Sequence, residues 1–304
     1  MMDGLIQNWN GILIPIVLKE KRRPFFPNYI DNIIIANKES FPDDFIQKKI
    51  RPSNRSKSFI PEEYTKLQKN TGFYCELQSI SSEDAMTWSV FGNLNHVPKN
   101  QRVNFVQELL KHIGITSYSD DFKIALWTRI IHVDTGETRH GPEVDFSIIG
   151  DDTVILGESK WGSKIDERQG KSKKKTQLQL RREFLEKYGD SLYPDKPNKS
   201  VLLVGNEKPS EEIEKFVSWN DLCFYLRHPL GNELKRYFVW KHSLSQEGTV
   251  TCPNCKSENT ILRIIWGLPV IDLSKGKNPT MILGGCMVPE NPPQWGCKKC
   301  GLRF

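Results

Sequence analysis

Hydrophobic and polar residues alternate in two short runs near the middle of the chain, at residues 142–149 and 153–161. Successive side chains of a β-strand point to opposite faces, so this alternation predicts strands. The intervening Gly150-Asp151-Asp152 is polar and glycine-containing, which is typical of a tight turn. We therefore predict a β-hairpin over Pro142 to Trp161.

Helical and strand patterns flank this hairpin on both sides. Ser82 followed by Glu83 and Asp84 is a helix N-terminal signal, with a serine cap and acids in the first turn. Apolar residues at helical spacing predict a second helix over residues 100–113. The other predicted elements are a strand in Phe122–Val133, a helix over Thr176–Tyr188, a strand over Val201–Val204, and helices over Ser210–Phe216, Trp219–Leu226 and Asn232–His242.

The first 70 residues carry the weakest pattern. Asn10 to Leu18 is a plausible strand, and Phe41 to Ile50 and a segment starting at Pro61 are short helix candidates. A polar segment, Ser243 to Thr251, separates the helices from the cysteine-containing end of the chain. We expect three parts: an extension of uncertain fold at 1–70, a core with trailing helices at 71–245, and a small domain at 249–304.

The composition is that of a soluble globular protein. The 304 residues are 38% hydrophobic, with a mean hydropathy of −0.51. No apolar run reaches the length of a membrane span, and the first residues lack the basic-then-apolar order of a signal peptide. No phosphate-binding Gly-x-x-x-x-Gly-Lys loop occurs, so no nucleotide cofactor is evident. We expect a cytoplasmic protein without a membrane partner.

Positive charge is concentrated immediately after the hairpin. The chain has a formal net charge of +6. Residues 160–187 contain ten Lys/Arg against four Asp/Glu, a balance of +6, so the remainder sums to about zero. A basic stretch of this kind is compatible with a polyanion such as nucleic acid, or with a solvated loop.

The hairpin itself carries acids and a lysine. Asp145 lies on the first run, and Glu158 and Lys160 are two positions apart at the end of the second, where they should share a face. Carboxylates are ligands for a hard cation such as Mg²⁺ or Mn²⁺, and a lysine beside them can orient water or stabilise negative charge. This combination suits hydrolysis of a phosphodiester; the alternative is a structural hairpin with surface charges.

The order Asp145, then Glu158-x-Lys160, resembles the PD-(D/E)xK nuclease superfamily, which includes restriction endonucleases. The flanking order of helix, three strands, helix and strand over roughly residues 80–205 is similar to that superfamily's αβββαβ core. The resemblance implies an α/β fold with a mixed central sheet, a Mg²⁺-dependent deoxyribonuclease activity and DNA as the partner. It is also compatible with a homodimer, since many such enzymes dimerise to cut both strands.

The resemblance extends to further site residues. It implies an acid from the first core helix, for which Glu83 is the candidate and Asp84 the competitor. It implies a water- or phosphate-positioning glutamine at Gln177. Glu143, two residues before Asp145, should share its face and serves as a third acid or as a surface charge. Arg181, one turn beyond Gln177, is either a phosphate clamp or part of a polar helix face.

Four of the seven cysteines form two Cys-x2-Cys pairs near the end of the chain. Paired knuckles in a cytosolic chain indicate a structural zinc site, here Cys252, Cys255, Cys297 and Cys300. The 41 residues between the pairs accommodate a zinc ribbon with a long inserted β-hairpin. The ending around Cys297 resembles a small zinc-ribbon module, whose partner could be nucleic acid or protein.

Three functions remain open from the sequence. The first is a metal-dependent DNA endonuclease of restriction or defence type. The second is a repair or recombination nuclease that recognises DNA structure or ends. The third is a non-catalytic nucleic-acid-binding protein. The complete set of Asp145, Glu158 and Lys160 favours a nuclease over a binding protein.

Overall fold

A computed structural model describes most of the chain. The described residues are 4–18, 24–36, 76–162, 168–169, 175–206, 208, 215–245, 254–255, 257, 261–266, 281–285, 293 and 295–303. The chain divides into two compact units, Met1–Ser245 and Gln246–Phe304. Each unit is treated below by itself.

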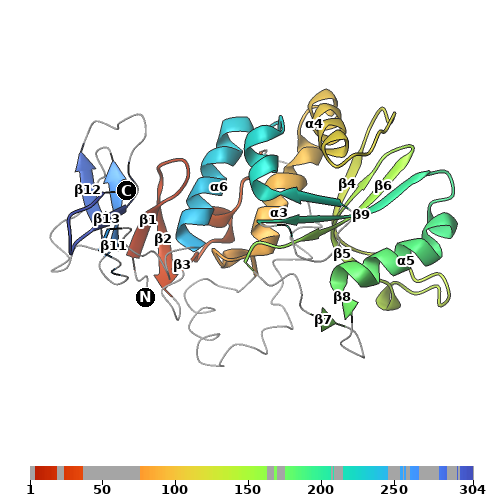
Figure 1. The fold of residues 1–304 in the computed structure, drawn as a ribbon, viewed down its shortest axis with the longest axis horizontal. Helices are drawn as coiled ribbons and strands as arrows, with labels where there is room; N and C mark the ends of the chain where they lie inside the picture. The colour runs from red at the N-terminus through yellow and green to blue at the C-terminus, as the bar shows by residue number, and fades with distance from the viewer. Residues whose placement is uncertain are drawn as a thin grey trace. The chain divides into compact units, whose positions relative to one another are not determined.

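The first unit is built on a five-stranded mixed sheet with the order β10-β9-β6-β5-β4 (Figure 1). Its antiparallel half confirms the predicted hairpin, because β5 pairs with β6 through Ile149↔Val154 and Phe146↔Gly157. β6 pairs in parallel with β9, and β9 with β10. The strands are β4 (Lys123–Arg129), β5 (Glu143–Ile149), β6 (Thr153–Ser159), β9 (Asn198–Gly205) and β10 (Lys215–Ser218).

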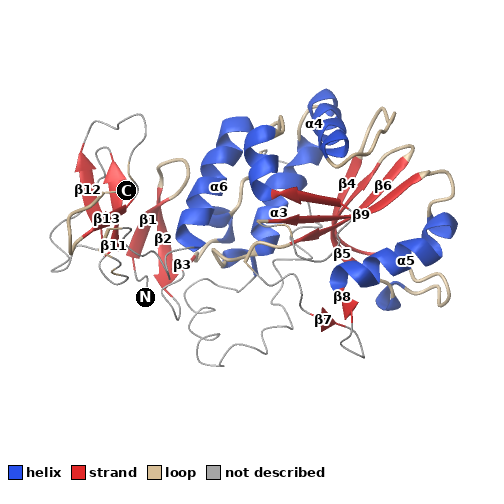
Figure 2. Cartoon of the chain, viewed as in Figure 1, coloured by secondary structure: helices blue, strands red, loops and turns tan. Residues whose placement is uncertain are grey.

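Helices cover both faces of this sheet, as Figure 2 shows. One face packs against α5 (Gln177–Leu192) through Phe184, Leu185 and Tyr188. The other face packs against three helices, which share a single core cluster: α3 (Glu83–Phe91), α4 (Lys99–His112) and α6 (Gly231–Ser245). β6 is buried along its whole length because it lies between two strands and two helical layers. The α/β class is thus confirmed.

The described part of the N-terminal segment belongs to this unit. β1 (Gly4–Gln7), β2 (Leu13–Leu18) and β3 (Pro24–Phe25) form an antiparallel sheet, which confirms the predicted strand near Asn10–Leu18. Its hairpin packs on α6: the Trp240 indole donates to the Gln7 carbonyl at 2.8 Å, and the Trp9 ring meets the Trp240 ring edge-on. The packing of indole rings on α6 therefore anchors this sheet.

Short elements complete the first unit. The 3₁₀ turns are η2 (Tyr29–Asn32), η6 (Glu76–Gln78), η7 (Gly92–His96) and η8 (Thr138–His140). A two-stranded ribbon, β7 (Arg168–Gln169) and β8 (Lys175–Thr176), precedes α5.

One predicted helix is corrected by the structure, one is confirmed with a different helical geometry, and two lie outside the described residues. Lys215 and Phe216 belong to β10, because the apolar residues of this segment extend the sheet beside β9. The segment predicted as a helix over Trp219–Leu226 is helical, and its main part is the π-helix η9 (Asp221–Tyr225). The candidates at Phe41–Ile50 and from Pro61 fall outside the described residues.

The second unit contains a three-stranded sheet with the order β12-β11-β13. Its strands are β11 (Ile261–Trp266), β12 (Met281–Gly285) and β13 (Trp295–Cys297). β11 pairs antiparallel with β13 but parallel with β12. The expectation that an inserted hairpin separates the cysteine pairs is therefore wrong for β11 and β12, because parallel strands require a crossover connection.

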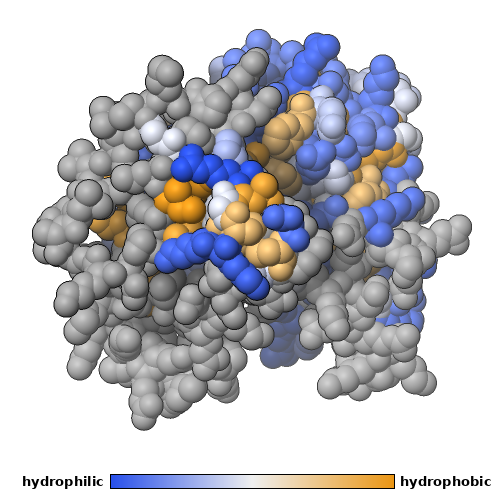
Figure 3. All heavy atoms as spheres, turned by 60° about the vertical axis from the view of Figure 1, so that its left-hand side comes forward, coloured by the Kyte–Doolittle hydropathy of each residue, from blue (hydrophilic) through white to orange (hydrophobic). Residues whose placement is uncertain are grey.

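Hydrophobic and hydrophilic residues are interspersed on the face of the molecule drawn in Figure 3. Scattered apolar side chains of this kind are normal on protein surfaces. Among the described residues, no helix combines the length and apolar character needed to cross a membrane.

Candidate active site

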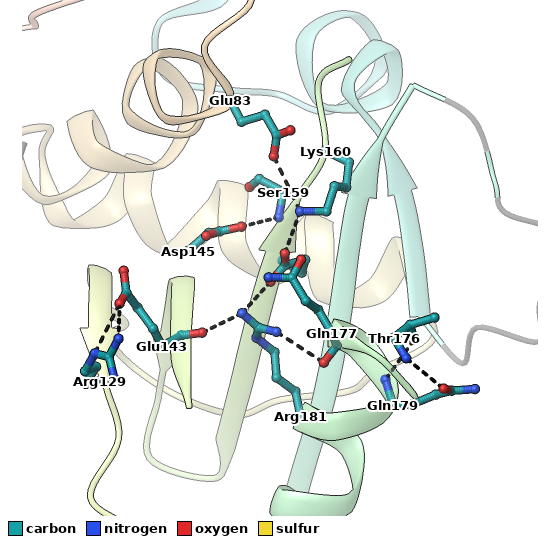
Figure 4. A network of polar contacts seen from close by, with 11 residues as sticks. Glu83, Arg129, Glu143, Asp145, Ser159, Lys160, Thr176, Gln177, Gln179 and Arg181 are labelled. Carbon is teal, nitrogen blue, oxygen red and sulfur yellow. Dashed lines mark hydrogen bonds and ion pairs between the residues drawn. The ribbon is translucent and has the colours of Figure 1, made fainter. Parts of the chain in front are cut away.

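Charged side chains from four elements meet at the end of β6 (Figure 4). Glu158 is almost completely buried on β6, and its Oε1 accepts a 2.7 Å hydrogen bond from the Lys160 ammonium. The same ammonium lies 3.5 Å from Oε2 of Glu83, at the start of α3. The structure thus joins the predicted neighbours Glu158 and Lys160 to a third predicted site residue, Glu83, that is distant in sequence.

Asp145 belongs to the same group of charges. Its Oδ2 accepts a 2.8 Å hydrogen bond from the backbone N–H of Ser159, which ties β5 to the end of β6. Burial, reinforced by the nearby negative charge of Glu158, raises the pKa of Asp145 to about 7; the Ser159 N–H and Lys160 oppose this rise. Asp145 therefore exchanges its proton near neutral pH, where a cation could replace that proton.

The side chains of β5 stop alternating regularly between the two faces of the sheet at Asp145. Val144 packs in the cluster on the α5 side of the sheet, whereas Phe146 packs in the cluster on the opposite side. Across the strand pair, Leu126 pairs with Phe146 and Thr128 with Val144, and Trp127 between them has a φ of 49°. A positive φ is unusual for a bulky residue, so the backbone is locally distorted beside Asp145.

This distortion has a consequence for Glu143. Two residues on a regular strand share a face, and Glu143 was expected to join Asp145. Instead, its Oε2 accepts hydrogen bonds from Arg129 on β4, at 3.0 and 3.2 Å, and the pair is partly exposed. The structure places Glu143 in a cross-strand ion pair rather than with the other acids.

The acids on α3 are positioned by its N-terminal cap. The Ser82 hydroxyl accepts a hydrogen bond from the Ala85 N–H, as the sequence signal predicts. Glu83 then reaches Lys160, while the negative charge of Asp84 adds to the forces that raise the pKa of Asp145. Of the two candidates, Glu83 is thus the α3 acid that contacts Lys160 directly, and Asp84 acts on Asp145 through its charge.

Arg181 is the residue whose position the sequence patterns did not settle. It lies on the inner side of α5 with only 7% of its surface exposed. Its Nη2 is 2.7 Å from Oε2 of Glu158 and 2.5 Å from the Glu143 carbonyl, and its Nη1 donates to the Gln177 carbonyl at 3.1 Å. The interpretation of Arg181 as part of a polar helix face is wrong.

A signal for this burial was present in the sequence. Arg181 is three, four and seven residues before Phe184, Leu185 and Tyr188, the residues that pack on the sheet. Positions at this spacing lie on one helix face. An arginine in phase with buried apolar residues should be expected to have a buried partner.

The two glutamines at the start of α5 differ in role. Gln179 forms a capping box with Thr176: the Thr176 N–H donates to Gln179 Oε1 at 2.9 Å, and the Gln179 N–H donates to the Thr176 hydroxyl. Gln177, the predicted site residue, is partly exposed, and Figure 4 shows its side chain running from α5 toward Lys160.

The charges of the group fit a divalent cation. Glu83, Asp84, Asp145 and Glu158 supply four negative charges and Lys160 and Arg181 two positive ones, so the sum is −2 when all are ionised. Glu158 Oε2 is buried and accepts no hydrogen bond. Its contact with Arg181 is short enough for an ion pair but does not have the geometry of a hydrogen bond. Carboxylate oxygens are the ligands that Mg²⁺ and Mn²⁺ prefer, so the donors fit such an ion.

Lys160 remains protonated in this setting. Burial favours the neutral form of its amine, but the neighbouring Glu158 and Glu83 outweigh burial and raise the pKa of Lys160. Its backbone is also fixed, because its N–H donates to the Val204 carbonyl and its carbonyl accepts from the Trp219 indole at 2.9 Å. Lys160 therefore presents a positioned positive charge beside the carboxylates.

Replacing Asp145 with asparagine should stabilise the metal-free fold at alkaline pH. The folded-state pKa of about 7 exceeds the ordinary value of 3.8, so the folded protein binds this proton more tightly than the unfolded chain does. The fold is therefore most stable with respect to this group below pH 3.8, and it loses that stability as the pH rises through about 7. We expect Asp145→Asn to raise the free energy of unfolding by about 1–4 kcal/mol at about pH 8 and far less at about pH 4. Urea denaturation in EDTA measures the free energy of unfolding of both proteins at each pH. A difference between the two proteins that does not change with pH would contradict this prediction.

The second unit contains a cysteine cluster. The sulfur atoms of Cys255, Cys297 and Cys300 all lie within 4.8 Å of one another, and those of Cys255 and Cys297 are 3.5 Å apart. Sulfurs about 2.3 Å from a tetrahedral ion would be separated by about 3.8 Å, so the spacing suits a metal ion. Cys252, the fourth predicted ligand, lies outside the described residues.

The turn at Cys297–Gly301 positions two of these sulfurs. The Cys297 N–H donates to the Leu302 carbonyl, and the Gly301 N–H donates to the Cys297 carbonyl, both at 2.8 Å. Gly301 has a φ of 75°, a conformation that glycine adopts without a steric penalty. The backbone therefore folds back after Cys300, and both sulfurs reach the same point.

Known sequences do not assign the chain to a family. No protein-family model matches it. No curated protein matches it significantly either. Its own structure defines a mixed α/β protein with a buried cluster of carboxylates, lysine and arginine, followed by a small unit with a cysteine cluster suited to a metal ion.

Proposed function

We propose that this protein is a metal-dependent endonuclease that hydrolyses phosphodiester bonds of DNA, of the PD-(D/E)xK type and with a restriction or defence role. The observation that carries the proposal is the meeting of Asp145, Glu158 and Lys160 at the end of β6, with Glu83 completing the group. Burying acids beside a positioned lysine costs desolvation free energy, and such groups cluster at functional sites.

Asp145 and Glu158 would hold the Mg²⁺ or Mn²⁺ ion, with an acid of α3 nearby. When bound, such an ion lowers the pKa of a coordinated water and neutralises charge on the phosphate oxygens. Lys160 keeps its proton, so its role is to orient the attacking water and stabilise the negative charge that develops at phosphorus, rather than to act as a base. Gln177 extends toward Lys160 and would orient the phosphate.

Two alternative functions remain, one that would need the same site and one that would not. A repair or recombination nuclease would have the same site but would recognise ends or junctions instead of a sequence. A non-catalytic binding protein would not need Asp145, Glu158 and Lys160 together, and their meeting argues against it. Incubation of the purified protein with plasmid, linear and single-stranded DNA, with Mg²⁺ and with EDTA, separates the three. Absence of any Mg²⁺-dependent product would refute the proposal.

Zn²⁺ is the proposed ion of the cysteine cluster, held by Cys252 together with Cys255, Cys297 and Cys300. Thiolates select zinc over Mg²⁺, so the two metal sites should not exchange ions. A site closed by four sulfurs would be structural, and metal binding would supply much of the folding energy of this small unit.

The basic segment before α5 is the proposed DNA contact. β7 and β8 pair antiparallel, with Arg168 opposite Thr176, and so bring this segment directly to the start of α5. The Lys175 ammonium pairs with Glu183 at 2.6 Å in the absence of DNA. A phosphate group would have to compete with this exposed pair, which is weak in water.

Removing Lys173, Lys174 and Lys175 together should weaken DNA binding equally across sequences. Each phosphate contact contributes about −0.9 to the log–log dependence of affinity on salt, so the triple alanine variant should flatten the slope by up to about 2.7. Binding isotherms at several salt concentrations measure this. Cleavage at saturating DNA should change little, and an unchanged slope would place the DNA path elsewhere.

A further inference from the structure

Arg181 and Lys160 both contact Glu158, but they are held very differently. Lys160 is fixed at its backbone, and within the described part of the chain its ammonium contacts the carboxylates of Glu158 and Glu83. The Arg181 guanidinium also donates to two backbone carbonyls, on α5 and β5. Backbone carbonyls cannot rotate away as side chains can, so the guanidinium is locked in place.

We propose that Arg181 is a positioning residue, which holds the Glu158 carboxylate in the one orientation that binds the catalytic metal. The inference rests on the proposed function and adds a residue to it. The guanidinium links three elements: the Gln177 carbonyl of α5, the Glu143 carbonyl of β5 and the Glu158 side chain of β6. Arg181 therefore fixes Glu158 relative to the strand that carries Asp145.

The alternative role, a phosphate clamp, does not fit the contacts. The Arg181 side chain is only 8% exposed, and its Nη atoms are directed at protein carbonyls and Glu158. A clamp would need its planar fork open to the substrate. Arg181 is buried on the side of α5 that carries Phe184 and Leu185, which pack on the sheet.

Lysine at this position should fail to replace arginine. A lysine keeps the positive charge but has one ammonium and no planar fork, so it cannot hold Glu158 and two carbonyls in fixed geometry. We expect Arg181→Lys and Arg181→Met to weaken Mn²⁺ affinity by about 10–100-fold, in line with losses of residues that orient metal ligands. The turnover rate should fall together with the Mn²⁺ affinity, while the KM for DNA stays within about threefold of the wild-type value.

The test measures Mn²⁺ binding to the full chain without DNA, by electron paramagnetic resonance of free Mn²⁺, alongside kcat and KM. Arg182→Met is the matched control, because Arg182 is the next residue, is half exposed and lies 3.8 Å from Glu186 on the same helix, away from Glu158. It should bind Mn²⁺ as the wild type does. Arg181→Lys keeps the charge that a buried site needs, so it tests the role even if Arg181→Met does not fold.

Three outcomes would overturn the inference. Arg181→Lys with wild-type Mn²⁺ affinity would show that the fork is unnecessary. A raised KM for DNA with unchanged Mn²⁺ affinity would establish the phosphate clamp instead. Wild-type protein that binds no Mn²⁺ would refute both this inference and the proposed function. Wild-type protein that binds Mn²⁺ through Asp145, loses it in Arg181→Lys and cuts no nucleic acid would refute the function alone.

Discussion

Replacing Lys160 or Asp145 with alanine is expected to abolish Mg²⁺-dependent cleavage while leaving DNA affinity within a few-fold. The Lys160 ammonium contacts Glu158 at 2.7 Å, and Asp145 supplies an acid at the same place. Loss of charge stabilisation in a water-poor site costs several kcal/mol of activation free energy, which corresponds to about 10³-fold or more in rate. DNA affinity should persist because phosphate contacts elsewhere dominate it.

Asp151→Ala is the matched control for this test. Asp151 is an exposed acid in the turn of the same hairpin, and its carboxylate accepts a 3.3 Å hydrogen bond from the Asp120 N–H, away from the site. It should cut DNA at the wild-type rate. Single-turnover cleavage and filter-binding affinity measure the two quantities separately. Near-wild-type cleavage by either Lys160→Ala or Asp145→Ala would refute the assignment of the site.

The second large effect concerns zinc. We expect one tightly bound Zn²⁺ per chain, about 1 mole by elemental analysis, and its loss when Cys252 and Cys255 are both replaced by serine. The sulfurs of Cys255, Cys297 and Cys300 lie within 4.8 Å of one another, so each contributes to one ion. Removing two thiolates leaves too few ligands for a closed tetrahedral site. The metal should then dissociate, and the small unit should unfold when it does.

Cys223→Ala is the control for the zinc experiment. Cys223 is a buried thiol whose pKa is raised by burial, so it behaves as an apolar core residue and not as a ligand. This variant should retain the ion. A chain without zinc, or zinc retained in the Cys252/Cys255 double variant, would contradict the prediction. Proteolysis with and without a chelator would show whether residues 246–304 lose protection when the metal leaves.

The sequence alone determined the central hairpin and much of the α/β order. Local patterns were sufficient because alternation fixes strands, and a polar turn of three residues fixes which strands pair. The cap at Ser82 and the helix containing Gln177 follow the same local rules. Lys215 and Phe216, the end of the helix predicted over Ser210–Phe216, were misassigned because a short segment is equally compatible with a strand or a helix until its neighbour β9 is known.

Only the tertiary structure decided how the charged residues are grouped. Strand periodicity predicted that Glu143 would join Asp145, but the distortion beside Trp127 changes the alternation and Glu143 pairs with Arg129. Asp84 and Arg181 enter the group through packing of α3 and α5 against the sheet. Local patterns fix which side of an element a residue occupies and so predict the contact of Glu158 with Lys160. Partners at long sequence separation are fixed by how the elements pack, and that packing gave Glu158 its second cation, Arg181.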